Sequence, residues 1–133
     1  MIDKLNCIML IDDDDDDNFF HKKEIMDNHL AESVIVQDSA RKALEYLKFK
    51  TEPVSDLIFL DINMPGMNGW EFLDEYQKLG KEQQSRAMII MLSTSSNPKD
   101  KEKANSWDCV TDYITKPLTK QALETVIKKH FNL

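Results

Sequence analysis

The feature that most constrains the fold is an alternation of short apolar runs with segments of helical periodicity. Four apolar runs are Cys7 to Ile11, Val34 to Val36, Leu57 to Leu60 and Ala87 to Leu92, and Val110 to Ile114 is a fifth, weaker strand. Short runs without polar alternation are typical of strands that are buried on both faces, and such strands belong to parallel sheets. Five strand and helix units predict an α/β fold in which helices cover both faces of a parallel sheet.

Capping signals and apolar spacing locate the helices between these runs. The predicted helices run from about Asp17 to Leu30, from Ser39 past Leu47, from Asn68 to Leu79, from Asn97 to about Trp107, and up to about His130. Ser39 is a helix cap, and Asn68 with Glu71 three residues later forms a capping box. Asn97 followed by Pro98 is a cap with proline at the first helical position.

The number of strands and the handedness of their connections restrict the topology. Right-handed crossovers leave few doubly wound orders, and the flavodoxin-like order 2-1-3-4-5 suits five strands. Strands one and three are then neighbours at the switch point, where ligands bind at the carboxyl ends of the strands. A length of 133 residues predicts that residues 1–133 form a single domain.

Composition excludes several classes of protein. A formal net charge of −7 disfavours a nucleic-acid binder, because that binding requires Lys and Arg to neutralise phosphates. No apolar segment is long enough to insert into a membrane and no signal peptide is visible, which predicts a cytoplasmic protein. Cys7 and Cys109 lack a metal-ligand spacing, so both are predicted to be reduced, small apolar residues.

Carboxylates follow two of the predicted strands. Asp12 and Asp13 follow the first, and Asp61 follows the third, so the predicted strand order brings all three together. Three converging carboxylates repel one another unless a hard cation lies among them, and Mg2+ prefers such oxygen ligands. The run from Asp12 to Asp17 does not match the ligand spacing and glycine of an EF-hand calcium loop, and most of Asp14 to Asp17 is predicted to be a solvated, helix-capping surface.

The remaining strand ends supply groups that bind phosphoryl oxygens. Ser93 follows the fourth strand with a hydroxyl, and Lys116 follows the fifth with an ammonium group. A carboxylate nucleophile, a magnesium site, a hydroxyl and a lysine are together what phosphoryl transfer to aspartate requires, because the charge of the transferred group must be neutralised. The residues therefore indicate an aspartyl phosphate at Asp61.

Over nearly its whole length the chain resembles the receiver domain of a bacterial two-component response regulator. The matching features, in order, are Asp12 and Asp13, the Asp61 loop with Met64-Pro65-Gly66 and Gly69, Ser93, Tyr113, and Lys116-Pro117. The ordered set is specific, although each member alone is a weak signal. No residues remain after the fifth predicted helix for an output domain, which is typical of a stand-alone receiver.

The resemblance implies a role for each site residue. Asp61 would accept a phosphoryl group from a phosphohistidine on a sensor histidine kinase or a histidine phosphotransfer protein. Mg2+ would be bound by Asp13 directly, by Asp12 mainly through water, by Asp61, and by the backbone carbonyl of Asn63. Ser93 would hydrogen-bond the phosphoryl group and Lys116 would pair with it.

The resemblance also implies how the signal is passed on. Ser93 and Tyr113 would act as switch residues, with Tyr113 changing its exposure as the loop at Ser93 moves. The face formed by the fourth helix, fifth strand and fifth helix would then bind a downstream protein that the sequence does not identify. The protein would be a phosphoacceptor that assists its own phosphorylation and dephosphorylation, not a dedicated turnover enzyme.

Two other functions stay open at this point. Asp12 and Asp14 form an Asp-x-Asp pattern that would suit a small haloacid-dehalogenase-like phosphatase, with its nucleophile on the first strand. A degenerate receiver would bind partners without being phosphorylated. The three histidines, His21, His29 and His130, have no visible nucleophile or metal partner and are predicted to have surface or packing roles.

Overall fold

The computed structural model describes residues 4–49, 51–80 and 87–131. Five parallel strands form one sheet in the order β2-β1-β3-β4-β5, as the sequence predicts. The strands are β1 (Leu5–Ile11), β2 (Ala31–Gln37), β3 (Leu57–Asp61), β4 (Met88–Ser93) and β5 (Val110–Thr115). The helices are α1 (Asp15–Asp27), α2 (Ala40–Lys48), α3 (Gly69–Lys78), α4 (Pro98–Asn105) and α5 (Lys120–Phe131). The chain therefore has the flavodoxin-like fold.

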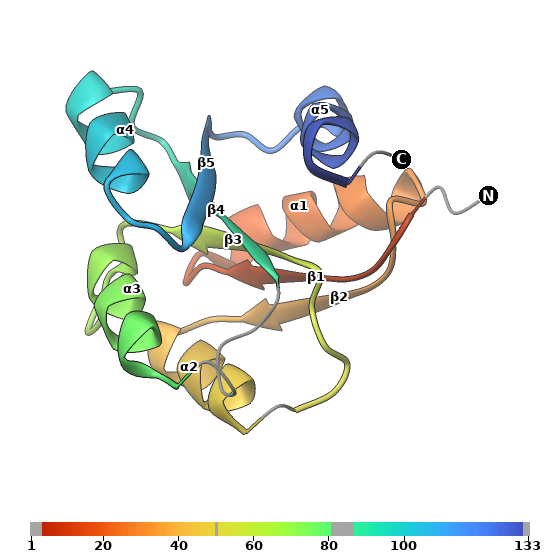
Figure 1. The fold of residues 1–133 in the computed structure, drawn as a ribbon. Helices are drawn as coiled ribbons and strands as arrows, with labels where there is room; N and C mark the ends of the chain where they lie inside the picture. The colour runs from red at the N-terminus through yellow and green to blue at the C-terminus, as the bar shows by residue number, and fades with distance from the viewer. Residues whose placement is uncertain (1–3, 50, 81–86, 132–133) are drawn as a thin grey trace.

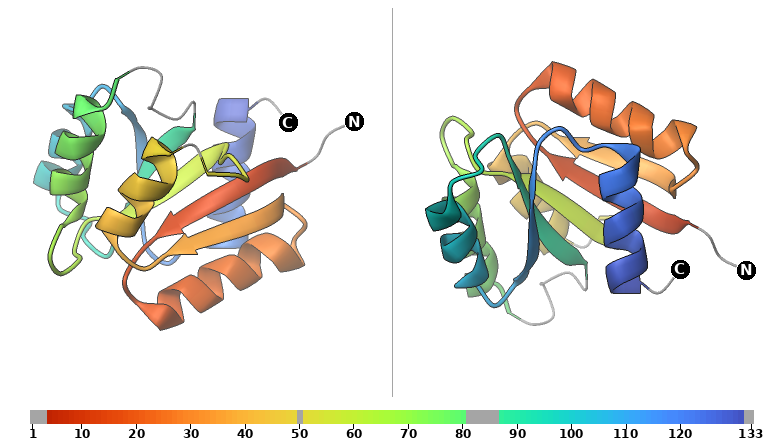
Figure 2. Two further views of the ribbon diagram at one scale, coloured as in Figure 1. Left: turned by 90° about the horizontal axis from the view of Figure 1, so that it is seen from below. Right: turned by 90° about the horizontal axis from the view of Figure 1, so that it is seen from above.

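The helices cover both faces of the sheet (Figures 1 and 2). Successive residues of β3 point to opposite faces, as the pleat of a strand requires. Ile58 and Leu60 pack in a hydrophobic cluster with α2, α3 and α4, whereas Leu57 and Phe59 pack in a second cluster with α1 and α5. Burial on both faces explains why this strand is a continuous apolar run.

The predicted caps are confirmed. The side chain of Ser39 accepts a hydrogen bond from Lys42 N at 3.2 Å. In the capping box before α3, Glu71 N donates to Asn68 Oδ1 at 2.9 Å and Asn68 N donates to Glu71 Oε1 at 3.0 Å. The side chain of Asn97 caps α4. Side-chain oxygens thus satisfy backbone N–H groups that have no partner inside the helix.

The predicted boundaries of the first helix, Asp17 to Leu30, were wrong at both ends. The helix begins at Asp15 because Asp14 is the cap, and its side chain accepts a hydrogen bond from Asp17 N at 3.0 Å. It ends at Asp27, and His29 then adopts a left-handed φ of 54°. Leu30 leaves the helix and is buried beneath α1 at the start of β2.

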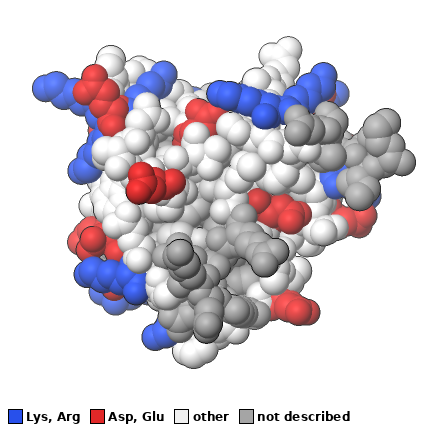
Figure 3. All heavy atoms as spheres, viewed as in Figure 1, with Lys and Arg blue, Asp and Glu red and all other residues white. Residues whose placement is uncertain are grey.

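Both cysteines of the chain, Cys7 and Cys109, are free, as predicted. None of the helices in the described ranges has both the length and the apolar character needed to cross a membrane. On the visible part of the face in Figure 3, basic and acidic side chains are interspersed.

Candidate functional site

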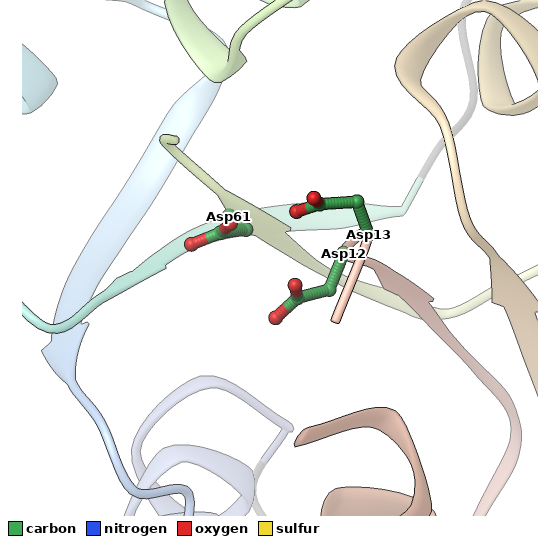
Figure 4. Close-up of side chains that lie close together, drawn as sticks. All are labelled: Asp12, Asp13 and Asp61. Carbon is green, nitrogen blue, oxygen red and sulfur yellow. The ribbon is translucent and has the colours of Figure 1, made fainter. Parts of the chain in front are cut away.

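Three carboxylates meet at the carboxyl edge of the sheet, as the strand order predicts. In the register of β1 and β3, Ile11 pairs with Leu60, so the residues that follow, Asp12 and Asp61, lie side by side. Asp12, Asp13 and Asp61 each offer a carboxylate oxygen, and these oxygens all lie within 4.8 Å of one another. Figure 4 shows the three side chains directed toward a common space.

Burial and charge make Asp61 an unusual carboxyl group. Only 6% of Asp61 is exposed, and Asp12 is also buried, whereas Asp13 is exposed. Loss of solvation raises the pKa of Asp61 to about 6, and the negative charge of Asp12 acts in the same direction. Lys116 opposes this shift by stabilising the carboxylate. Asp61 is therefore ionised at neutral pH in an environment that favours a cation.

Lys116 supplies positive charge at this site. Its ammonium nitrogen, Nζ, lies 2.7 Å from Asp12 Oδ2, 2.8 Å from Asp17 Oδ2 and 3.3 Å from Asp61 Oδ1. Burial opposes the charged form of Lys116, but the hydrogen bonds to Asp12 and Asp17 outweigh burial and raise its pKa. The lysine side chain is thus fixed as a cation among three carboxylates.

Ser93 ends β4 at the same edge of the sheet. The side chain is buried, and its Oγ accepts a hydrogen bond from Ser95 N at 3.1 Å. Lys116 N donates to the carbonyl oxygen of Ser93 at 2.7 Å, so the ends of β4 and β5 are linked directly. The structure places Ser93 beside the carboxylate cluster, with its hydroxyl held by the loop that follows it.

Tyr113 connects β5 to that same loop. Its hydroxyl donates a hydrogen bond to the carbonyl oxygen of Ser95 at 2.6 Å, and the side chain is half-buried. Movement of the loop after Ser93 would therefore break or move a hydrogen bond of Tyr113. This hydrogen bond, together with the one from Ser95 N to Ser93 Oγ, connects the two predicted switch residues through Ser95.

The loop after Asp61 is closed by backbone contacts at two glycines. Asn63 is exposed two residues after Asp61. Gly66 has a left-handed φ of 78°, and Gly69 N closes the loop by donating to Ile62 O at 2.8 Å. A Cβ atom at Gly69 would lie 2.6 Å from the backbone oxygen of Asp61, so only glycine fits there. The two glycines therefore shape this turn.

Two residues of the site region, Asp17 and Asn18, were not identified from the sequence. Asp17 contacts Lys116, although the sequence placed it in a solvated acidic run. Asn18 is buried and its Nδ2 donates to the carbonyl oxygen of Asp12 at 2.8 Å. His21 is buried, and its Nε2 accepts a hydrogen bond from Leu118 N at 3.3 Å, which confirms a packing role. The spacing of Asp17 and His21 by four residues was the available signal for Asp17, since such residues share a helical face.

The donor atoms of the cluster suit a hard cation. The group comprises carboxylate oxygens without nitrogen or sulfur ligands, which favours Mg2+ or Ca2+ over the transition metals. Two of the three carboxylates are buried, and their mutual repulsion would be relieved by a divalent ion. The residues present therefore fit a divalent metal site.

Solved structures of known proteins share this fold. Residues 8–128 match the family model described as response regulator receiver domain, and the chain belongs to this family. A two-component response regulator from Cytophaga hutchinsonii is 34% identical, with a TM-score of 0.87 and coverage of 98% of this chain and 99% of that one. A response regulator receiver protein from Dyadobacter fermentans is 28% identical, with a TM-score of 0.83 and coverage of 94% and 97%.

Some curated relatives are much longer proteins. Hybrid signal transduction histidine kinase B of Dictyostelium discoideum is 31% identical over 119 residues, which are 82% of this chain and 6% of the relative. The chain likewise covers 11% of the sensor histidine kinase CheAY of Helicobacter pylori. The match is to one segment of each kinase, and the family assignment is that of a receiver domain in two-component signalling.

Proposed function

We propose that this chain is a phosphorelay receiver that accepts a phosphoryl group from a phosphohistidine onto Asp61. The observation that carries the proposal is the position of Asp61, a buried carboxylate flanked by the carboxylates of Asp12 and Asp13 and by the ammonium group of Lys116. This arrangement gives one nucleophilic oxygen, a cation site and a fixed positive charge around the same point. Together they meet the electrostatic demand of phosphoryl transfer.

The acidic cluster would hold Mg2+. Asp12, Asp13, Asp61 and the backbone carbonyl of Asn63 are the proposed protein ligands. The ion, when bound, supplies positive charge that offsets the negative charge of the transferred group. The oxygen-only donor set and the mutual repulsion of the three carboxylates support this assignment.

The remaining groups of the site assist the transfer. An Oδ of Asp61 attacks the phosphorus atom, and the bond from phosphorus to the imidazole nitrogen of the donor breaks as the new P–O bond forms. Lys116 pairs with the phosphoryl oxygens, and Ser93 donates its hydroxyl proton to one of them. Asp61 is ionised for this attack at neutral pH because its pKa is about 6. The protein is a phosphoacceptor, not a dedicated turnover enzyme.

The signal would leave the site through the loop after β4. When Ser93 turns toward the phosphoryl group, its hydrogen bond to Ser95 N changes, and the carbonyl of Ser95 is the acceptor for Tyr113. Tyr113 lies on β5, so the face formed by α4, β5 and α5 would change its affinity for a downstream protein. The histidine kinases among the relatives support a kinase or phosphotransfer protein as the phosphodonor.

Phosphorylation can be tested with a small donor. Incubation with acetyl phosphate and Mg2+ is expected to add one phosphoryl group to the protein, and borohydride reduction followed by peptide mapping should locate it at Asp61. Addition of a chelator is expected to slow labelling by about tenfold or more, because the charge of the transferred group is no longer offset.

Other labelling results would support one of the two alternative functions. Labelling at Asp12 or Asp14 would contradict the proposal and support a phosphatase-like chemistry on β1. An unlabelled protein that also fails to bind Mg2+ would support a degenerate receiver. Transfer from a panel of purified phosphorylated histidine kinases would then identify the cognate donor.

A further inference from the structure

One face of α1 holds the loop that carries Lys116. Three of its side chains, spaced by four and three residues, contact the chain from Lys116, just after β5, to Lys120, the first residue of α5, so they lie on one face of the helix. The contacts join Asp17 Oδ2 to Lys116 Nζ at 2.8 Å, Leu118 N to His21 Nε2 at 3.3 Å, and Lys120 N to Glu24 Oε2 at 3.0 Å. Alternate residues from Lys116 to Lys120 are thus bonded to successive turns of α1.

The contact with Asp17 differs from the other contacts of Lys116. Asp12 and Asp61 belong to the carboxylate cluster, whereas Asp17 lies outside it on the first turn of α1. Lys116 Nζ lies closer to Asp12 and Asp17, at 2.7 and 2.8 Å, than to Asp61, at 3.3 Å. The ammonium group is therefore displaced toward Asp12 and Asp17 and away from the phosphoacceptor.

This displacement matters because Lys116 has only three N–H donors. A phosphoryl group on Asp61 must take at least one of them, and a cation among the carboxylates would compete for Asp12. Asp17 is then the carboxylate that continues to hold Lys116 on the α1 side. Its side chain is 34% exposed, so solvent weakens the ion pair without removing it.

We propose that Asp17 is a positioning residue that restrains Lys116 and thereby slows phosphorylation of Asp61. The inference rests on the proposed function, since it assumes that Lys116 must turn toward the phosphoryl group. Asp17 also adds a negative charge near the point where a phosphodonor carrying negative charge must approach. Removal of that charge should both release Lys116 from α1 and reduce the repulsion between the site and the phosphodonor.

Asp17→Asn tests this role, with Asp16→Asn as the matched control. Both changes remove one carboxylate from the first turn of α1, but Asp16 is exposed. Asp17→Asn is expected to speed labelling by acetyl phosphate on the order of fivefold, the effect of a partly screened ion pair, whereas Asp16→Asn should match the parent protein. The side-chain NMR resonances of Lys116 should shift in Asp17→Asn and not in Asp16→Asn. Urea unfolding of both variants shows whether each is as stably folded as the parent protein.

The results separate this inference from the proposed function. Failure of the parent protein to label at Asp61 would overturn the proposed function, whatever Asp17 does. A labelled parent with unchanged or slower labelling in Asp17→Asn would overturn the restraining role. Equal shifts of the Lys116 resonances in both variants would show that Asp17 does not act through this lysine.

Discussion

Asp61→Asn is expected to abolish labelling by acetyl phosphate and to raise the free energy of unfolding at neutral pH by about 1–3 kcal/mol. The amide removes the nucleophile but keeps the shape of the side chain. Burial and the charge of Asp12 raise the pKa of Asp61 from 3.8 to about 6 in the folded protein. Ionised Asp61 therefore disfavours the folded state, and the neutral amide removes that cost.

The sign of the pH dependence follows from these two pKa values. The unfolded chain releases the Asp61 proton near pH 3.8, and the folded chain releases it near pH 6. The contribution of Asp61 to stability is thus highest below the unfolded pKa and declines as pH rises through the folded pKa. Urea unfolding of both proteins without metal, from about pH 4 to about pH 8, should show their stabilities diverging up to about pH 6 and differing by a constant amount above it.

Two comparisons strengthen this experiment. Mg2+ should stabilise the parent protein more than Asp61→Asn, because the variant lacks one of the proposed ligands. Lys116 keeps its closer partners Asp12 and Asp17 in the variant, so little attraction is lost. The exposed Asp16→Asn change should alter stability by less than about 0.5 kcal/mol. A less stable Asp61→Asn protein would refute the electrostatic explanation.

Gly69→Ala is expected to destabilise the protein by about 1–3 kcal/mol or more, through overpacking against backbone atoms. The new Cβ would lie 2.6 Å from Asp61 O and 2.9 Å from Ile62 Cα. Because a displaced backbone at Asp61 would misplace the nucleophile, labelling by acetyl phosphate should also slow. Urea unfolding and the labelling rate measure the two effects.

Gly80→Ala is the control for this change. A Cβ atom at Gly80 meets nothing within 4 Å, so alanine is expected to be neutral or to stabilise the protein by up to about 1 kcal/mol. Equal effects of the two substitutions would contradict the steric explanation for Gly69.

Strand order and the carboxylate cluster were predictable because both depend on short-range patterns. The strands β1, β3 and β4 are buried and mainly apolar, and a polar residue stands at or just after the carboxyl end of each, as Asp12 follows Ile11. Lys116 likewise follows Thr115 of β5. A parallel arrangement then places these ends at one edge of the sheet. The residues after the strands could therefore be assigned to one site before their distances were known.

The contact of Asp17 with Lys116 was not predictable in the same way. The two residues are 99 positions apart, and their contact depends on how α1 packs beside the loop before α5. Within six consecutive aspartates, the local pattern does not distinguish the helix cap, Asp14, from the residue that turns inward, Asp17. The start of α1 was misplaced for the same reason.

The division of the interior into two clusters has a consequence for redesign. Ile58 and Phe59 are adjacent in β3 but belong to different clusters, so a change of side-chain volume in one layer reaches the other only through the strand backbone. Ala104 of α4 packs in the layer opposite α1. If α4 contributes to the proposed partner-binding face, it can therefore be repacked for a new downstream protein without a change in the α1 layer, which contacts Lys116.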